Sequence, residues 1–213
     1  MKFAAVVPAA GLSSRMGDFK PLLDLNGRPM IIRTLDSLRA AGCGTICVVT
    51  GHRAEELEAA AEATDVCFLR NENYRSTGML ESVQLGLAEL LAEPSAVSGS
   101  DGQAALQTAF FILPADIPLV SAQTMEALRT EAEKGGSFAL RPSFNGRAGH
   151  PVLLDRTMAL ALMAYRGEDG LRGFLRKAAE IQPEIVRVIA CEDPGILADA
   201  DTPEDFQALA GLK

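Results

Sequence analysis

The chain has 213 residues, which is enough for one sizeable α/β domain and too few for two. Its 48% hydrophobic and 23% charged residues are typical of a globular protein, and no apolar run, the brief one at residues 3–7 included, is long enough for a membrane span or a secretory signal. The formal net charge of −8 excludes a general nucleic-acid binder, so we expect one cytoplasmic domain, residues 1–213, without nucleic-acid or membrane partners.

The first predicted element is a short strand over residues 3–7, followed by a loop of small residues that contains two cations, Arg15 and Lys20. Small residues let backbone N–H groups approach phosphate oxygens closely, and the cations add positive charge. The segment 8–20 therefore predicts a binding site for a polyphosphate.

The glycine spacing in this segment excludes two common phosphate loops. Gly11 and Gly17 are separated by five residues and Lys20 follows three positions later, whereas a Walker loop needs Gly-x-x-x-x-Gly-Lys-Ser/Thr. Ser13 and Met16 stand where a Gly-x-Gly-x-x-Gly loop needs glycines. The alternative without a function is a glycine-rich strand-to-helix turn with solvated cations.

Strand-like runs and helical patterns alternate along the next part of the chain. Strands are expected over residues 45–50, 66–69 and 110–113, and amphipathic helices over 30–38 and 80–91. This alternation predicts parallel strands joined by right-handed helical crossovers, with a ligand crevice at the carboxyl ends of the strands. The segment 8–20 follows such an end.

The second half of the chain is less regular. Residues 93–108 are rich in Ser, Gly and Ala without a clear period, which predicts a surface loop. Strands at 138–140 and 151–154 enclose many turn residues, so we expect a small antiparallel excursion around residues 137–154 that covers a second substrate. Helices from residue 155 and over 170–180, a strand over 185–190 and a short helix from residue 203 complete the chain.

Asp116 follows a hydrophobic strand and lies between two prolines. A carboxylate there suits Mg²⁺, because this ion takes one or two protein carboxylates and fills its other positions with water and phosphate. The second carboxylate would come from Asp199 or Asp201. The structural alternative is that Asp201 or Thr202 caps the helix that starts at Pro203.

Three further polar residues have both a functional and a structural interpretation. His150 stands between a glycine and a proline that restrict its backbone beside the predicted crevice. Arg172 would meet a phosphate, or would pair on the surface with Glu168 or Asp169 for less than ~1 kcal/mol. Ser82 would contact a base, or would only bond the helix backbone.

The four cysteines, Cys43, Cys47, Cys67 and Cys191, lie in apolar or strand-like segments. Cys43 and Cys47 have the spacing C-x-x-x-C, but no second ligand pair for zinc accompanies them. We expect buried free thiols and neither a metal site nor a disulfide.

The pattern Ala-Ala-Gly-x-Ser-x-Arg-Met-Gly-x-x-Lys of residues 9–20 resembles the signature of nucleotidyltransferases related to the molybdenum cofactor enzymes. Later blocks resemble those of the molybdenum cofactor cytidylyltransferases and occur in the same order along nearly the whole chain. These blocks are Asn71, Gly78-Met79 with Ser82, Asp116-x-Pro118, Gly149-His150-Pro151, Gly167-x-Asp169-Gly170-x-Arg172 and Asp199-x-Asp201-Thr202-Pro203-x-Asp205.

Members of that family have a Rossmann-like nucleotidyltransferase fold, in which helices flank a mostly parallel central sheet. They transfer CMP from CTP to the terminal phosphate of molybdopterin cofactor and release pyrophosphate. The resemblance thus implies CTP and a molybdopterin-type cofactor as substrates, Mg²⁺ as the cofactor and a client molybdoenzyme as a partner. Residues of about 1–120 would bind the nucleotide, and those of about 137–175 the acceptor.

The resemblance also assigns roles to individual residues. Catalytic roles fall to Arg15, Lys20 and Asp116. Nucleotide-binding roles fall to Ala9, Ala10, Gly11, Arg15, Lys20, Gly51, Asn71, Gly78 and Ser82. Acceptor binding falls to His150 and Arg172, and metal binding to Asp116, Asp199 and Asp201.

Three positions depart from the family pattern: Glu81, Ala115 and Ile117. They leave open a nucleotidyltransferase that uses another phosphorylated acceptor, such as a sugar phosphate, or that uses GTP. Ala10 favours CTP, since guanylyl-transferring relatives commonly have glycine there. A noncatalytic protein that delivers molybdopterin is the alternative from another class, and the full set of cations and carboxylates disfavours it because a pure binder does not need that set.

Overall fold

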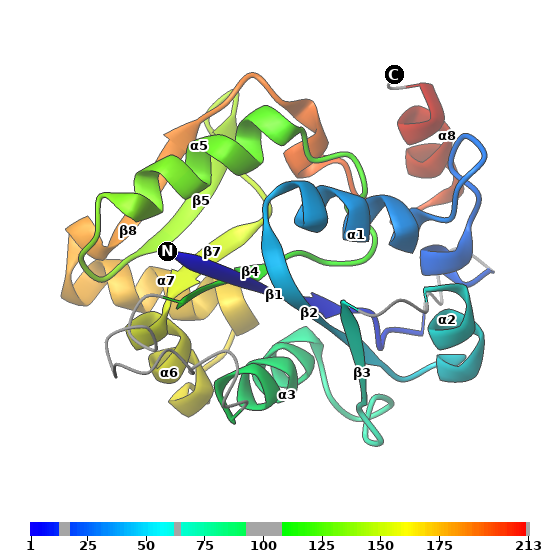
Figure 1. Ribbon diagram of the computed structural model, residues 1–213, viewed down its shortest axis with the longest axis horizontal. Coiled ribbons are helices and arrows are strands. Elements are labelled where there is room, and N and C mark those ends of the chain that lie inside the picture. The colour runs from blue at the N-terminus through cyan, green and yellow to red at the C-terminus, as the bar shows by residue number, and fades with distance from the viewer. Residues whose placement is uncertain (13–17, 62–64, 93–107, 212–213) are drawn as a thin grey trace.

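The computed structural model describes residues 1–12, 18–61, 65–92 and 108–211, which fold around an eight-stranded sheet (Figure 1). The strand order is β3-β2-β1-β4-β7-β5-β6, and β8 pairs with β5. The strands are β1 (Lys2–Pro8), β2 (Cys43–Thr50), β3 (Val66–Arg70), β4 (Thr108–Ile112), β5 (Ala139–Phe144), β6 (Arg147–Ala148), β7 (Val152–Asp155) and β8 (Val186–Ala190).

The sheet has a parallel half and a mixed half. β1 lies between β2 and β4 and is parallel to both, and β3 is parallel to β2. β7 is antiparallel to β4 and to β5, and β8 is parallel to β5. The predicted mostly parallel sheet with an antiparallel part around residues 137–154 is confirmed, and that part continues the central sheet. The chain leaves β1 toward β2 on one side and later returns to β4 on the other, so a topological switch point lies between β1 and β4.

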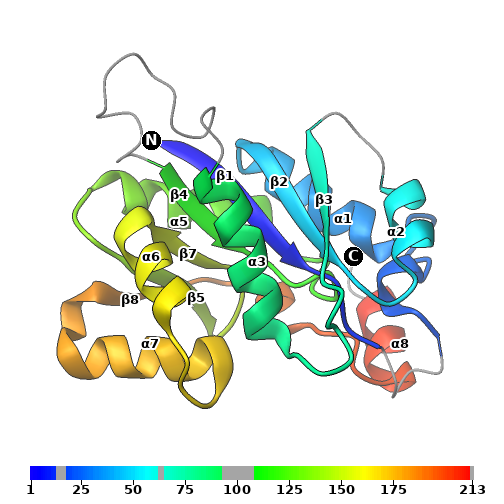
Figure 2. The same cartoon turned by 90° about the horizontal axis from the view of Figure 1, so that it is seen from below.

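Helices cover both faces of the sheet (Figures 1 and 2). One face carries α1 (Met30–Ala40), α2 (Ala54–Ala60) and α5 (Ala122–Glu133), and the other carries α3 (Met79–Ala92), α6 (Arg156–Ala164) and α7 (Gly170–Ile181). The remaining helical segments are η1 (Lys20–Leu22), η3 (Pro183–Ile185), η4 (Pro194–Leu197) and α8 (Pro203–Gly211).

The hydrophobic pattern explains this layering. Ala5 and Val7 of β1 pack into the core under α1 and α5, while Ala4 and Val6 pack into the core under α3. Successive side chains of a strand point to opposite faces, so a strand buried on both faces reads as an unbroken apolar run. That is why residues 3–7 predict a central strand.

Two helices, α2 and α5, are absent from the elements predicted from sequence. α2 has seven residues, of which only Ala54 and Leu57 are buried, so its apolar stripe is too short to stand out. α5 buries Met125, Leu128 and Ala132, which have helical spacing, and this spacing could have predicted the helix. The predicted surface loop over residues 93–108 lies outside the described residues apart from Thr108, which begins β4.

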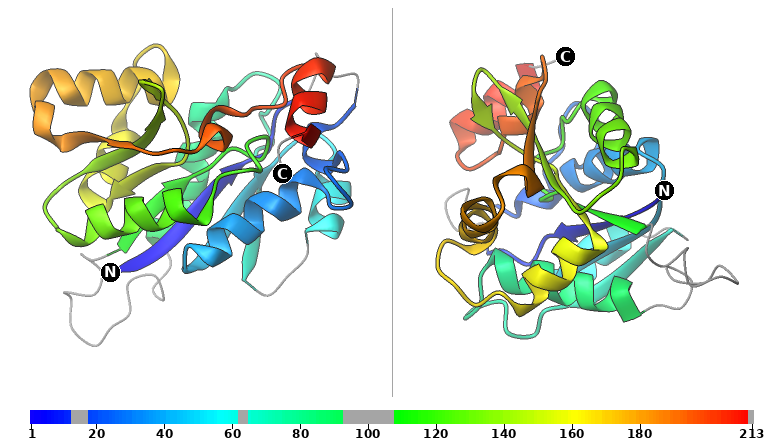
Figure 3. Two further views of the ribbon diagram at one scale, coloured as in Figure 1. Left: turned by 90° about the horizontal axis from the view of Figure 1, so that it is seen from above. Right: turned by 90° about the vertical axis from the view of Figure 1, so that its left-hand side faces the viewer.

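A small separate cluster holds the C-terminal part in place. Leu25 and Met30 pack against Ala200 and against Leu209 of α8. Figure 3 shows the red α8 beside the blue segment that precedes α1. Because Ala200 is fully buried there, its neighbours Asp199 and Asp201 are brought close to Lys20, at the opposite end of the sequence.

The cysteines agree with the expectation of free thiols. Cys43 and Cys47 are buried, Cys67 and Cys191 are half-buried, and all are free. Burial raises the pKa of Cys43 to about 12, so this thiol is protonated and unreactive at neutral pH. None of the helices in the described ranges combines the length and the apolar character that crossing a bilayer requires.

Candidate active site

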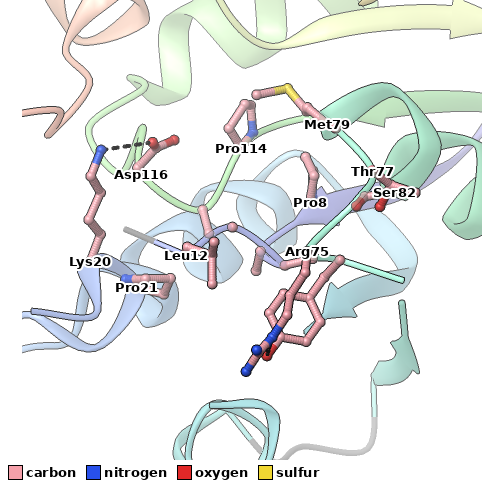
Figure 4. A pocket seen from close by; sticks show the side chains of 16 residues that line it. Pro8, Leu12, Lys20, Pro21, Arg75, Thr77, Met79, Ser82, Pro114 and Asp116 are labelled. Atoms are coloured by element: carbon pink, nitrogen blue, oxygen red, sulfur yellow. Dashed lines mark hydrogen bonds and ion pairs between the residues drawn. The ribbon is translucent and has the colours of Figure 1, made fainter. Parts of the chain in front are cut away.

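A cavity of about 330 Å³ opens at the carboxyl ends of β1 and β4, where the topology predicts the crevice (Figure 4). It is lined by Pro8, Ala9, Ala10, Gly11, Leu12, Lys20, Pro21, Tyr74, Arg75, Thr77, Gly78, Met79, Ser82, Pro114, Ala115 and Asp116. Most residues predicted to bind nucleotide are thus in its wall. Arg15 lies outside the described residues.

Lys20 is the central cation of the cavity wall. Its ammonium group donates to Oδ1 of Asp201 at 2.6 Å and lies 3.8 Å from Oδ2 of Asp116 (Figure 4). Only 10% of the Lys20 side chain is exposed, and a buried ammonium group needs such partners. Residues from the beginning, middle and end of the chain therefore meet in one charged cluster.

Asp116 is positioned by the backbone that extends beyond β4. The N–H of Ala115 donates to the carbonyl of Pro8 at 3.4 Å, which continues the pairing between β1 and β4. The hydroxyl of Thr34, on α1, donates to the carbonyl of Ala115 at 3.3 Å. These contacts fix the turn that presents the Asp116 carboxylate to Lys20.

Among the described residues, the carboxylates of Asp116, Asp199 and Asp201 gather around one lysine, Lys20. Burial raises the pKa of Asp116 above its usual range, and the charges of Asp199 and Asp201 add to this effect against the opposing effect of Lys20. Burial and then Asp201 likewise raise the pKa of Asp199. A further cation at this place would relieve the repulsion.

This donor set fits Mg²⁺, a hard cation that prefers oxygen ligands. Within the described ranges, no group of three or more His, Cys, Asp and Glu side chains is close enough to hold an ion. One or two carboxylates would then share the ion with phosphate and water oxygens, which is the usual arrangement for Mg²⁺.

Thr202 is the residue that caps α8. Its hydroxyl accepts from the N–H of Asp205 at 3.2 Å, and the Asp205 carboxylate accepts from the N–H of Thr202 at 2.9 Å. This reciprocal arrangement is a capping box. Asp201 is directed instead to Lys20, so the capping and the charged cluster use different residues.

Two residues that depart from the family pattern have structural roles. The Glu81 carboxylate accepts from the N–H of Gly78 at 2.9 Å, at the start of α3. Ile117 is only 6% exposed and belongs to the core under α1 and α5. Ala115, in contrast, lines the cavity.

The loop after β3 forms the opposite wall of the cavity. The amide nitrogen of Asn71 donates to the hydroxyls of Thr77 (2.9 Å) and Ser82 (3.2 Å). Asn71 therefore holds the loop through these hydrogen bonds without lining the cavity, while Ser82 lines it. Tyr74, Arg75 and Thr77 are lining residues that the sequence reasoning missed, although their place after the carboxyl end of a predicted strand is a usable signal.

Gly51 leaves no room for a side chain. A Cβ atom there would lie 2.7 Å from Cβ of Tyr74 and 2.9 Å from the carbonyl oxygen of Ala10. We expect Gly51→Ala to lower the free energy of unfolding by about 1–3 kcal/mol and to raise the KM for nucleotide, because the two cavity walls must separate. Urea unfolding and steady-state kinetics measure both effects. Gly44→Ala is the control, since Gly44 is on β2, the strand that Gly51 follows, and its Cβ would meet nothing within 4 Å. Equal unfolding midpoints for the two variants would contradict the prediction.

A second pocket, of about 480 Å³, adjoins the first and shares Gly78 and Met79 with it. His150 and Arg172, the two residues predicted to bind the acceptor, both line it. The N–H of His150 donates to the carbonyl of Ile196 at 2.9 Å, which fixes the backbone there. Asp169 pairs with Arg176 at 3.1 Å. The surface pair between Arg172 and Asp169, which is the structural alternative for Arg172, is therefore not formed.

His150 should make stability depend on pH. Burial, with the charge of Arg141, lowers its pKa from 6.5 to about 4. As pH falls from 6.5, the unfolded chain takes up a proton that the folded protein does not, so stability is lost on acidification until the folded pKa is reached. We expect wild type to lose up to about 3 kcal/mol more than His150→Gln between pH 7 and about pH 4.5. Urea unfolding at both pH values measures this, and equal losses in the two proteins would contradict it.

A mixed α/β sheet with a cavity over its switch point, bordered by a buried lysine and by the carboxylate of Asp116, is the arrangement of a nucleotidyltransferase. The chain belongs to the MobA-like NTP transferase domain family, whose model matches residues 5–182. It is 27% identical over 202 residues to the molybdenum cofactor cytidylyltransferase of Escherichia coli (strain K12), a match that covers 94% of this chain and 92% of that protein. The family expected from the sequence blocks is confirmed.

Solved structures show the same fold. A nucleotidyl transferase from Methanothermobacter superposes with a TM-score of 0.77 at 25% identity, covering 99% of this chain and 96% of that one. Rv0371C of Mycobacterium tuberculosis H37Rv in complex with manganese superposes with a TM-score of 0.71 at 22% identity, covering all of both chains.

Proposed function

We propose that this nucleotidyltransferase transfers CMP from CTP to the terminal phosphate of a molybdopterin-type cofactor, with Mg²⁺, and releases pyrophosphate. The observation that carries the proposal is the cluster of Lys20, Asp116 and Asp201, of which Lys20 and Asp116 line the cavity. The nucleotide would bind to residues of about 1–120 and the acceptor to those of about 137–175. The product would pass to a client molybdoenzyme.

The residues of the cavity would act by position and charge. A phosphate monoester is already anionic near neutral pH, so it can attack the α-phosphorus in line without a strong general base. The Lys20 ammonium has three donors, so it can keep its bond to Asp201 while it neutralises triphosphate oxygens. Arg15 would add a second cation from the same loop.

Asp116, together with Asp199 or Asp201, would hold the Mg²⁺ ion. When bound, this ion supplies positive charge to the triphosphate and to the departing pyrophosphate. The manganese complex of a protein with the same fold supports a divalent ion here, and so do the pKa values of Asp116 and Asp199, which burial and the neighbouring carboxylates raise.

The choice of CTP and of the acceptor has two supports. One is the cytidylyltransferase relative, which matches 94% of this chain. The other is Ala10, a cavity-lining alanine where guanylyl-transferring relatives commonly have glycine.

Pyrophosphate release from each of CTP, GTP, ATP and UTP with Mg²⁺ tests the proposal, in the presence of molybdopterin cofactor, of a sugar phosphate or of no acceptor. We expect release with CTP and molybdopterin cofactor. Release that needs GTP or a sugar phosphate would replace the proposed substrate, and no release under any pairing would favour the noncatalytic delivery protein.

A further inference from the structure

Arg141, on β5, is a cation without a counter-charge in the second pocket. One of its terminal nitrogens donates to the carbonyl of Ala148 at 3.3 Å. Its Nε is buried and has no hydrogen-bond partner, and among the described residues Arg141 forms no ion pair. Burial, with the like charge of Arg172, lowers its pKa. A half-buried guanidinium in this state is partly desolvated, and an anion that binds to it would replace the lost interactions with water.

His150, which lines the same pocket, has a second unpartnered polar atom. Nδ1 of His150 is buried and has no hydrogen-bond partner. Orphaned polar atoms are uncommon in protein interiors, because each loses its hydrogen bonds to water without replacement. Two such atoms belong to residues that line one pocket, Arg141 on β5 and His150 just before β7. We therefore expect this pocket to bind a ligand.

Among the described residues, the two acidic residues that line this pocket form no ion pair with Arg141 or Arg172. Glu81 accepts from the N–H of Gly78 at 2.9 Å, and Asp169 is paired with Arg176 at 3.1 Å. In this part of the structure the two guanidinium groups therefore line the pocket without a carboxylate bonded to them. An anion held there would lie beside the nucleotide cavity, because both cavities are bordered by Gly78 and Met79.

We infer that Arg141 and Arg172, beside His150, form a subsite for a phosphate monoester. Guanidinium groups match phosphate oxygens with pairs of parallel hydrogen bonds, which a single ammonium group cannot do. The identification of this phosphate as that of the acceptor rests on the proposed function. The presence of a phosphate-binding subsite at Arg141 does not.

Titration with inorganic phosphate, followed by NMR of the arginine Nε–H and histidine side-chain signals, tests the subsite on the full chain. We expect the signals of Arg141 and His150 to shift with one common Kd, and the pKa of His150 to rise from its value of about 4 as the anion binds. Arg141→Gln should weaken phosphate binding by about tenfold or more. Arg147→Gln, an exposed arginine on β6 outside the pocket, should leave it unchanged.

Signals that stay in place, or equal phosphate affinity in wild type and Arg141→Gln, would overturn the subsite. Arg141→Lys keeps the charge and should retain part of the affinity, so a loss in Arg141→Gln can be separated from misfolding. With pyrophosphate release as the readout, Arg141→Gln should raise the KM for acceptor and leave the KM for CTP unchanged. Phosphate binding at Arg141 without release from any nucleotide would uphold the subsite and reject the proposed function. Release with an unchanged acceptor KM in Arg141→Gln would uphold the proposed function and reject the acceptor's phosphate as the occupant of the subsite.

Discussion

Replacing Lys20 by alanine should lower turnover by about 10²-fold or more, the usual effect of losing one stabilising donor at developing charge. Lys20 is the cation that the structure places between Asp116 and Asp201. Without it, the triphosphate would face those carboxylates directly, and their repulsion would oppose both its binding and its reaction. Steady-state pyrophosphate release at saturating CTP and acceptor measures the effect.

Lys134→Ala is the matched control for Lys20→Ala. Lys134 is exposed and pairs with Glu131 one helical turn away, a contact that contributes little to stability. It should keep wild-type turnover. Wild-type turnover in Lys20→Ala, in a protein with an unchanged circular dichroism spectrum, would contradict the assigned role.

Asp116→Asn should also lower turnover on the order of 10²-fold, and it should weaken the binding of Mg²⁺. The substitution should not, however, lower the free energy of unfolding. Because folding raises the pKa of Asp116, the ionised carboxylate is disfavoured in the folded protein, and this cost is present at neutral pH, above the raised pKa. In EDTA at pH 7, Asp116→Asn should therefore be at least as stable as wild type.

Urea unfolding with and without Mg²⁺ separates these two effects. Mg²⁺ should stabilise wild type and stabilise Asp116→Asn much less. Asp36→Asn is the control, since Asp36 lies on α1 and pairs with Arg28 at 2.7 Å, outside the cavity. Equal stabilisation of wild type and Asp116→Asn by Mg²⁺ would rule out Asp116 as a metal ligand.

Local sequence patterns account for the central part of the fold. β1, β2 and β4 are buried and appear as apolar runs, and the parallel direction follows from the alternation with helices. The same reasoning brings Asp116 next to the segment 8–20, because both follow the carboxyl ends of adjacent strands. Sequence patterns do not predict α2, because a seven-residue helix with two buried residues has no clear hydrophobic period.

Long-range packing decides what the sequence leaves open. The sequence gives no sign that Asp201 pairs with Lys20, because this contact depends on the burial of Ala200 against Leu25 and Met30, far away in sequence. Arg141 has no sequence signal either, since an arginine in a strand is ordinary. Only the structure shows that its Nε is buried without a partner.

A crystal structure with a nonhydrolysable CTP analogue and Mn²⁺, with the metal located by its anomalous signal, tests the central claim most directly. The predicted result is a triphosphate on Lys20 and a metal ion bound to Asp116 and to Asp199 or Asp201. A metal ion and a triphosphate bound away from Lys20 and these carboxylates would contradict it.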